Sequence, residues 1–319
     1  MVDGLRCSCA GVSVESWKSN RRLDFGVWVS ESTGEMRTRR SEAYHNALRF
    51  TMSQQPGGQT SCSIVGSLHR FKNEGATNAD DFTFGELVDT LETLKSTYSI
   101  ALEKATIHSI EIGVNIELDC TVKSLLKCVI CHKGRAFAPI DVQDKWLGLV
   151  CTYTDYAIKL YDKGKQSGTA INGRNLLRVE IKLFRQRMLN EYAICTLVDL
   201  LCVEKVAPLL GLLLEKVGEI IFFDARLDVS NLSESKQLKW ERYSNPNYWE
   251  NLNRNTLHKS KKQFEILANL YGAIDYIKII SEKVCEKWAF LLESKLENRR
   301  RFPQVSEPLE STKQATFSQ

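Results

Sequence analysis

The clearest strand pattern in the chain is IHSIEIGVNIEL, residues 107–118. Alternate residues from His108 to Ile116 fall on one side of such a strand, and the residues between them fall on the other. The first set is mostly apolar and is expected to pack against a core. The second set, which contains Glu111, is therefore expected to line an accessible face of a β-sheet.

Two later stretches are predicted to be strands in which polar groups alternate with apolar ones. They are KLYDKGKQ, residues 159–166, in an expected strand at 156–163, and LLRVEIKL, residues 176–183, in an expected strand at 176–184. The connection between them is polar and glycine-rich, and its length favours an extended hairpin over a crossover. If the polar sides of all three strands face the same way, their charged residues share one surface.

The rest of the pattern separates a strand-rich first part from a helical second part. In the first part we expect strands at 23–29 and 62–71, a helix at 83–98 and a short helix at 122–131. After residue 185 we expect helices at 197–201, 206–221, 233–240, 247–251, 257–271 and 274–298.

These patterns predict an α+β fold, in which a mainly antiparallel β-sheet domain with flanking helices is followed by a helical C-terminal region. We expect the α+β domain at residues 1–190 and the helical domain at 191–298. Residues 299–319 are rich in Ser, Gln and Thr and are expected to form a disordered tail.

The composition is that of an ordinary soluble protein, with 43% hydrophobic and 26% charged residues in a chain of 319. The longest apolar run, residues 206–217, contains charges and is too short to span a membrane, and residues 1–4 do not begin an export signal. We therefore expect a cytoplasmic protein without a membrane partner, whose ten cysteines are reduced. The sequence CVICH, residues 128–132, has the spacing of a haem attachment motif, but we interpret it as a chance match.

The polar residues of the three strands combine groups that suit a reaction on a phosphodiester. The phenol of Tyr161 can be a nucleophile, and Glu111 and Glu180 can together bind a hard divalent cation, Mg²⁺ or Mn²⁺. Phosphate oxygens would be held by cations on the same strands, for which the candidates are Lys159, Lys163, Arg178 and Lys182. The alternative is structural: a tyrosine on a strand often only packs, and alternating charges often form cross-strand salt bridges on a solvated face.

The same residues resemble motifs of a known family. The pieces are MVDGL at residues 1–5, IEIGVN at 110–115, LYDK at 160–163 and LRVEIK at 177–182, in this order and spacing. Together they resemble the replication initiators of rolling-circle phages and plasmids, notably the filamentous-phage gene II/X type and the staphylococcal plasmid group. GSLHRFKN, residues 66–73, also resembles relatives on Bacteroidetes phages and plasmids, and the resemblance extends to about residue 270.

This resemblance implies a metal-dependent enzyme that nicks one DNA strand at a replication origin, stays attached to the 5′-phosphate and later rejoins the strand. It makes Tyr161 the nucleophile, Glu111 and Glu180 the metal ligands, and Lys163 and Arg178 phosphate contacts. The implied partners are origin DNA, single-stranded or supercoiled, and the helicase and polymerase of a bacterial host cell.

The chain departs from many related nickases because it has no His-hydrophobic-His metal motif. Ligation by acids is the better expectation, and the third ligand stays open, with Asn115 and His69 as guesses. Origin recognition is expected in the C-terminal region, where residues 236–248 and 258–262 combine basic and aromatic side chains.

Two other functions stay open at this point. A mobilisation relaxase would use the same chemistry for conjugative transfer. A DNA-binding replication factor could keep the scaffold without the catalysis, although it would have no need to retain Tyr161, Glu111 and Glu180 together.

Overall fold

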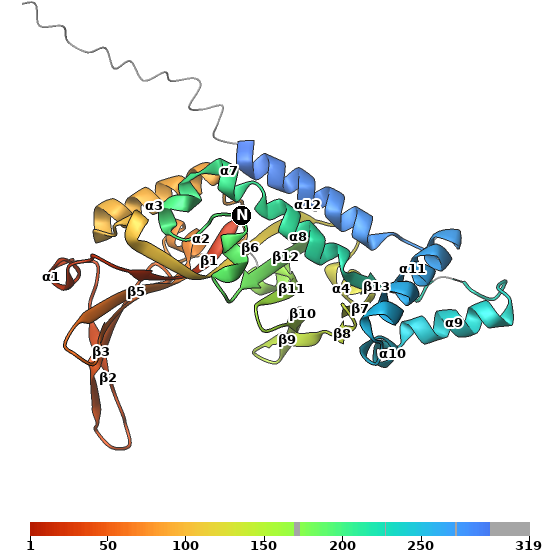
Figure 1. The fold of residues 1–319 in the computed structure, drawn as a ribbon, viewed down its shortest axis with the longest axis horizontal. Helices are drawn as coiled ribbons and strands as arrows, with labels where there is room; N and C mark the ends of the chain where they lie inside the picture. Colours follow the sequence, from red (N-terminus) through yellow and green to blue (C-terminus); the bar gives the residue numbers. More distant parts are fainter. Residues whose placement is uncertain (169–172, 227, 272, 294–319) are drawn as a thin grey trace, which may run out of the picture.

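The computed structural model describes residues 1–168, 173–226, 228–271 and 273–293, with residue 37 as backbone only. It confirms the α+β class, because one antiparallel sheet of ten strands dominates the first part and helices dominate the second (Figure 1). In spatial order the strands are β2 (Gly26–Val29), β3 (Met36–His45), β4 (Leu48–Gln54), β5 (Thr60–Ser67), β1 (Val2–Cys9), β6 (Ala105–Glu117), β12 (Leu176–Leu183), β11 (Tyr156–Asp162), β10 (Lys145–Thr152) and β9 (Ala138–Val142).

The predicted central strand is β6, which pairs with β1 on one side and β12 on the other. Its apolar residues from Ile110 onward are buried as expected, but His108 is exposed and the prediction for it is wrong. The cause is a β-bulge: Arg6 of β1 pairs with Ser109 while the next residue, Cys7, pairs with Ile107. The bulge leaves His108 unpaired and turns it to the opposite face of the sheet.

The strands β11 and β12 pair antiparallel, as predicted, from Tyr156 opposite Leu183 to Asp162 opposite Leu177. The connection between them differs from the expected extended hairpin, because β11 ends at Asp162 and the helix α5 (Lys163–Ser167) follows at once. The Asp162 side chain caps this helix by accepting a hydrogen bond from the Lys165 backbone N–H at 2.8 Å.

Helices cover one side of the sheet, where α3 (Phe84–Tyr98), α8 (Leu209–Gly218) and α12 (Tyr276–Glu293) lie along it (Figure 1). The prediction of α3 is confirmed, and a capping box between Thr83 and Glu86 fixes its start. The remaining elements are α1 (Val14–Lys18), α2 (Leu68–Lys72), α4 (Val122–Leu126), α6 (Arg187–Asn190), α7 (Val203–Val206), α9 (Glu234–Ser244), α10 (Pro246–Glu250), α11 (Arg254–Leu270), the 3₁₀ turns η1 (Leu102–Lys104) and η3 (Leu197–Leu201), and a small sheet of β13 (Ile220–Phe222), β7 (Val129–His132) and β8 (Arg135–Ala136).

Three elements end earlier in the chain than the sequence predicts. The strand at 62–71 stops at Ser67, whose side chain caps α2, and the helix at 206–221 stops before the strand β13. The short helix at 122–131 stops at Leu126, because the apolar residues that follow pair in the small sheet as β7.

Two hydrophobic cores hold the chain together. The larger joins the covered side of the main sheet to α3, α8 and α12. The smaller contains Trp240, Trp249 and Phe264 of α9 to α11 together with Cys131 of β7. Because α8 and α12 pack into the core of the sheet, the division at residue 190 stays a prediction; the tail at 299–319 lies outside the described residues.

Candidate active site

The strand register gathers the predicted site residues on the side of the sheet opposite the three covering helices. Lys159 of β11 pairs with Glu180 of β12, and Lys182 of β12 pairs with Glu111 of β6. Directly paired residues point to the same side of a sheet, as do residues two apart on one strand. We call this side the polar face; it carries Lys159, Tyr161, Arg178, Glu180, Lys182, Glu111 and Asn115.

The two glutamates share one cation, the ammonium group of Lys159. Its Nζ lies 2.7 Å from Oε1 of Glu180 and 3.4 Å from Oε1 of Glu111. The same oxygen of Glu111 also forms an ion pair with Nζ of Lys182 at 2.8 Å. Burial disfavours the charged form of Lys159, but the carboxylates of Glu180 and Glu111 outweigh this and raise its pKa. The two acids therefore lie where a single positive charge can bridge them.

Tyr161 lies on the polar face but does not project into solvent, since only 8% of it is exposed. Its hydroxyl group donates a long hydrogen bond of 3.4 Å to Oε2 of Glu180. Burial and the negative charge of Glu180 both raise the pKa of the phenol. The expectation that this strand face is accessible is thus wrong at Tyr161.

Arg178 and Glu180 are both buried and form an ion pair, with Nε of Arg178 3.2 Å from Oε2 of Glu180. The charges of Arg178 and Lys159 outweigh the effect of burial and keep the pKa of Glu180 below its usual range. Within the part of the chain that the structure describes, Nη2 of Arg178 has no hydrogen-bond partner and lies 3.6 Å from Oδ2 of Asp3. A buried guanidinium N–H without an acceptor can bind an anionic oxygen.

Asp3 is a member of the site that the motif chemistry did not include. It is buried on β1, faces Arg178 and accepts hydrogen bonds from the side chains of Ser67 and Asn78. Burial opposes its ionisation, but Arg178 and the two donors outweigh burial and lower its pKa. The signal available in the sequence was the opening MVDGL, which was part of the family resemblance but had no assigned role.

A polar cover, made of residues 77–79 and α5, closes this end of the polar face. The Nζ of Lys163, the first residue of α5, donates to Oδ1 of Asn78 at 2.7 Å and to Oε1 of Gln166 at 2.6 Å. Only 1% of Lys163 is exposed, and burial together with the nearby Arg178 lowers its pKa to about 8. Lys163 thus belongs to the cover and not, as predicted, to a strand face.

The other end of the polar face is open. A hollow of about 430 Å³ lies beside Glu111 and Lys182 and is also lined by Gly4, Arg6 and Ser109 among others. Gly4 leaves room for the present position of the Glu111 carboxylate, because a Cβ at residue 4 would lie 2.2 Å from Oε2 of Glu111. The site therefore runs from an exposed mouth at Glu111 to a covered end at Tyr161.

A metal ion fits this donor set only in a restricted way. Among the described residues, no group of three or more His, Cys, Asp or Glu side chains is placed to hold one. The suggested third ligands are placed elsewhere: Asn115 accepts from Arg178 at 3.4 Å, and Nε2 of His69 lies 2.8 Å from Oδ1 of Asp80. Two carboxylates are enough for Mg²⁺, which usually keeps several waters and binds substrate phosphate as well.

Two aromatic residues of the stretches expected to recognise an origin are packing residues. Trp240 and Tyr243, the best aromatic candidates in 236–248, are buried in the smaller core against Phe264. They are not available to stack on DNA bases, whereas origin recognition by the other residues of 236–248 and by 258–262 stays a prediction. Lys236 lies near Tyr271 and donates to its hydroxyl group at 2.7 Å.

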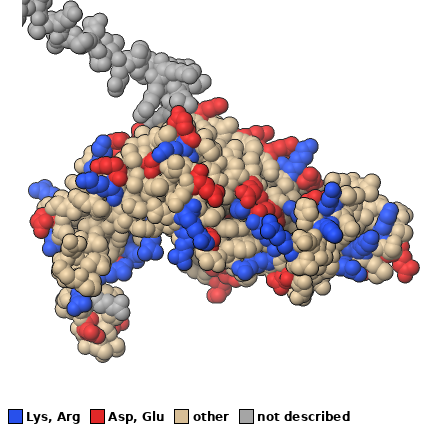
Figure 2. Space-filling view, viewed as in Figure 1, with Lys and Arg blue, Asp and Glu red and all other residues tan. Residues whose placement is uncertain are grey.

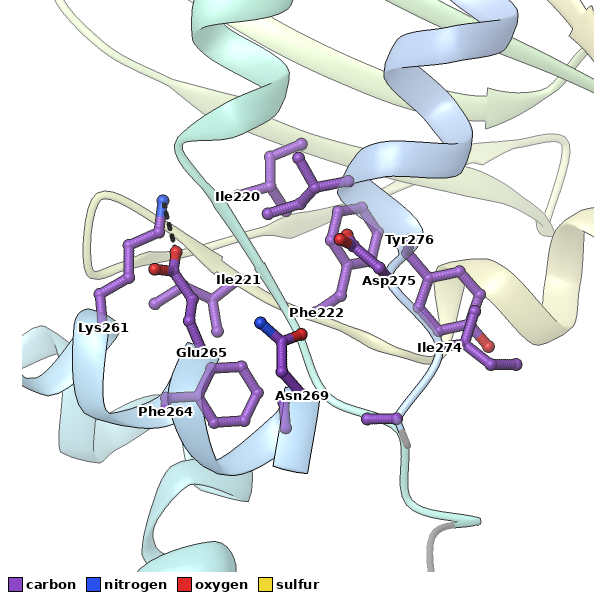
Figure 3. A pocket seen from close by; sticks show the side chains of 13 residues that line it. Ile220, Ile221, Phe222, Lys261, Phe264, Glu265, Asn269, Ile274, Asp275 and Tyr276 are labelled. Carbon is purple, nitrogen blue, oxygen red and sulfur yellow. Dashed lines mark ion pairs between the residues drawn. The ribbon is translucent and has the colours of Figure 1, made fainter. Parts of the chain in front are cut away.

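Two further candidates also have structural roles. His132 of the CVICH sequence is buried, with Nδ1 2.8 Å from the Tyr153 hydroxyl group and Nε2 3.2 Å from Glu219. A separate hollow of about 240 Å³ between β13, α11 and α12 contains the exposed pair Lys261 and Glu265, 3.9 Å apart, beside mostly apolar side chains (Figure 3). Neither place combines a nucleophile with groups that bind phosphate.

All ten cysteines are free thiols.

Comparisons with known proteins gave one likeness to report. No family model and no curated protein matches the chain. The fold is similar to the structure of the rolling circle replication initiator protein from Geobacillus stearothermophilus, with a TM-score of 0.39 and 13% sequence identity, over 82% of this chain and 96% of that chain. Within the described residues, no helix is both long and apolar enough to cross a membrane.

Proposed function

We propose that this protein initiates rolling-circle replication on a phage or plasmid by nicking and rejoining one DNA strand, with Tyr161 as the nucleophile. The observation that carries the proposal is the placement of a phenol against a carboxylate that is itself paired with two cations. Tyr161, Lys159 and Arg178 all contact Glu180, from two paired strands that carry the family motifs. A packing tyrosine on a strand does not need such an environment.

The chemistry follows from these contacts. The phenolic oxygen of Tyr161 attacks the phosphorus, the bond from phosphorus to the 3′-oxygen breaks, and a 5′-phosphotyrosine and a free 3′-hydroxyl form. The phenol proton passes to Glu180, which already accepts its hydrogen bond, and from there to solvent, while the leaving 3′-oxygen takes up a proton from solvent water. Arg178 and Lys159 stabilise the negative charge that develops on the phosphate oxygens. Rejoining is the reverse reaction with an incoming 3′-hydroxyl.

The cover must open before a phosphodiester can reach the phenol. The bonds that close it are those of Asn78 to Asp3 and Lys163, and that of Asn115 to the Ala79 carbonyl oxygen at 3.2 Å. All are polar, so a DNA phosphate can compete for the same donors. Lys163, released from Asn78, becomes a phosphate contact.

We further propose that Glu111 and Glu180 hold Mg²⁺ or Mn²⁺ when DNA is bound. The metal supplies a charge that polarises the scissile phosphate. For this the Lys159 ammonium group must leave its place between the carboxylates, where it lies 2.7 Å from Glu180. Lys159 then becomes free to bind a phosphate oxygen. The proposed partners are the DNA and the helicase and polymerase of a bacterial host, in whose cytoplasm we place the protein.

The test incubates the purified protein with supercoiled DNA that carries its own origin, with Mg²⁺ or Mn²⁺. Nicked circles and a covalent adduct are expected, and Tyr161→Phe should abolish both while Tyr192→Phe, a control away from the polar face, should not. Nicking that survives in Tyr161→Phe contradicts the proposal. Binding without any adduct in the wild type indicates the non-catalytic DNA-binding factor instead.

A mobilisation relaxase would give the same products in this assay. It is distinguished by the DNA substrate, since a relaxase nicks a transfer origin and an initiator nicks a replication origin.

A further inference from the structure

A hairpin arm projects from one edge of the main sheet. It consists of residues 26–45, with the strands β2 and β3, and extends away from the body of the molecule (Figure 1). Large apolar side chains are unusually exposed on it, including Trp28 at 57% and Tyr44 at 69%. An exposed cluster of this kind on a soluble protein indicates a binding surface.

Charged groups hold the side chains of the arm in place. The carboxylate of Glu42 accepts from Nε of Arg40 at 2.8 Å and from the Tyr44 hydroxyl group at 3.1 Å, and Arg49 of β4 approaches it to 3.8 Å. A hollow of about 550 Å³ lies beside them, lined by Arg40, Glu42, Tyr44 and Trp28 together with Asp24, Gly26 and Val27. Aromatic rings next to arginines can stack on bases and bind phosphates.

The arm shares its face of the sheet with the candidate active site. Tyr44 pairs with Arg49, Arg49 with Val65, Val65 with Arg6, and Arg6 with Ser109. Each directly paired residue points to the same side. Ser109 lies two residues before Glu111 on β6, so the row leads from the arm to the mouth of the site.

The space between these two places is open and basic. The hollow beside Glu111 and Lys182 also contains Arg6, which is exposed. Figure 2 shows lysine and arginine side chains in the recess between the projecting arm and the body. From β6 to β2 there are five strand spacings, or about 24 Å at ~4.8 Å each. A single strand must therefore be several nucleotides long to reach from the mouth of the site to the arm.

We propose that this face is a track for single-stranded DNA, on which Trp28 and Tyr44 stack against unpaired bases while Arg6, Arg40 and Arg49 bind the backbone. The inference rests on the proposed function, since it names the form of DNA that the site receives. A duplex fits less well, because its bases are already stacked on one another and offer no face to an exposed ring. A second copy of the chain also fits less well, because symmetric pairing of two arms would bring Arg40 and Arg49 against their own counterparts.

The test measures fluorescence anisotropy of a labelled 12-nucleotide single strand, and of the duplex of the same sequence, with the full-length protein. We expect the single strand to bind more tightly than the duplex. In the double variant Trp28→Ala/Tyr44→Ala, the affinity for the single strand should fall roughly 10-fold or more. Tyr44→Phe alone keeps the ring and should bind within about twofold of wild type. Circular dichroism of each variant checks that the fold is intact.

Three results would overturn the proposal of a track. They are wild-type affinity in the folded double variant, a preference for the duplex, and a change of oligomeric state when the arm is mutated. Nicking measured in parallel at saturating DNA separates the two proposals. If the double variant binds weakly but still nicks when saturated, both hold. If wild type binds the single strand through the arm but forms no tyrosine adduct, the track stands and the nicking function fails.

Discussion

The covered end of the polar face and the hairpin arm lie on the same side of one sheet but place their charges differently. At the covered end, Arg178, Glu180 and Asp3 are all buried and pair with one another. On the arm, Arg40 and Glu42 form a similar pair, but Arg40 is exposed to solvent and Glu42 is partly exposed. Burying charges costs several kcal/mol for each ion, whereas an exposed pair changes stability little. The comparison indicates that the buried network is kept for its chemistry and the exposed one for its contacts.

The largest difference is expected when the acid of each pair is changed to an amide. Glu180→Gln removes the nearer counter-ion of Arg178 and Lys159 and leaves them only the more distant Asp3 and Glu111, so we expect a loss of about 3–5 kcal/mol in the free energy of unfolding. Glu42→Gln, the matched change on the arm, should cost less than about 1 kcal/mol. Urea denaturation of both variants measures this, and equal losses would remove the distinction between the two regions.

A smaller effect is expected from the pH dependence of Lys163. Its pKa is 10.5 in an ordinary setting and about 8 in the folded protein, so between these pH values the unfolded chain binds the proton and the folded protein does not. Stability from this group therefore rises as the pH is raised from 8 to 10.5, by an amount on the order of 3 kcal/mol. The free energy of unfolding is measured for wild type and Lys163→Met at several pH values in this range. With increasing pH it should rise more steeply, or fall less steeply, in wild type than in the variant. Parallel curves would mean that the charge of Lys163 is not suppressed by burial.

Gly4→Ala should separate activity from stability. The new Cβ would lie 2.2 Å from Oε2 of Glu111, and the flexible end of that side chain can move away. We expect the free energy of unfolding to fall by only about 1 kcal/mol, but nicking to fall 10-fold or more because the carboxylate is displaced. Gly211→Ala, at an exposed position of α8 where nothing lies within 4 Å, is the control; it should leave nicking unchanged and should not lower the free energy of unfolding. Full nicking activity in a folded Gly4→Ala variant would exclude a precise role for Glu111.

Much of this arrangement was predictable from alternation along three strands. The period of two separates Glu111, Tyr161 and Glu180 from the apolar residues of their strands. Burial of those apolar residues in one core then places the three on the same side of the sheet, and the register confirms it. The strand β1 was not predicted, because the alternation of Leu5, Cys7 and Cys9 with Arg6 and Ser8 is short and rests on two cysteines, and Asp3 was missed with it.

Two other differences have local causes. A single-residue bulge turned His108 to the other face, and strand periodicity does not predict where a bulge occurs. Tyr161 is covered in part by Lys163, whose Nζ lies 5.8 Å from the centre of its ring, and Lys163 is held there by Asn78, which lies far away in the sequence.

The decisive measurement is the identity of the residue that becomes linked to DNA. A radiolabelled or fluorescent strand carrying the origin is incubated with the protein and metal, the adduct is digested with protease, and the modified peptide is sequenced by mass spectrometry. The account predicts a phosphodiester link on Tyr161, in the peptide that contains LYDK. A link to another residue, such as the exposed Tyr44 of the arm, would contradict it.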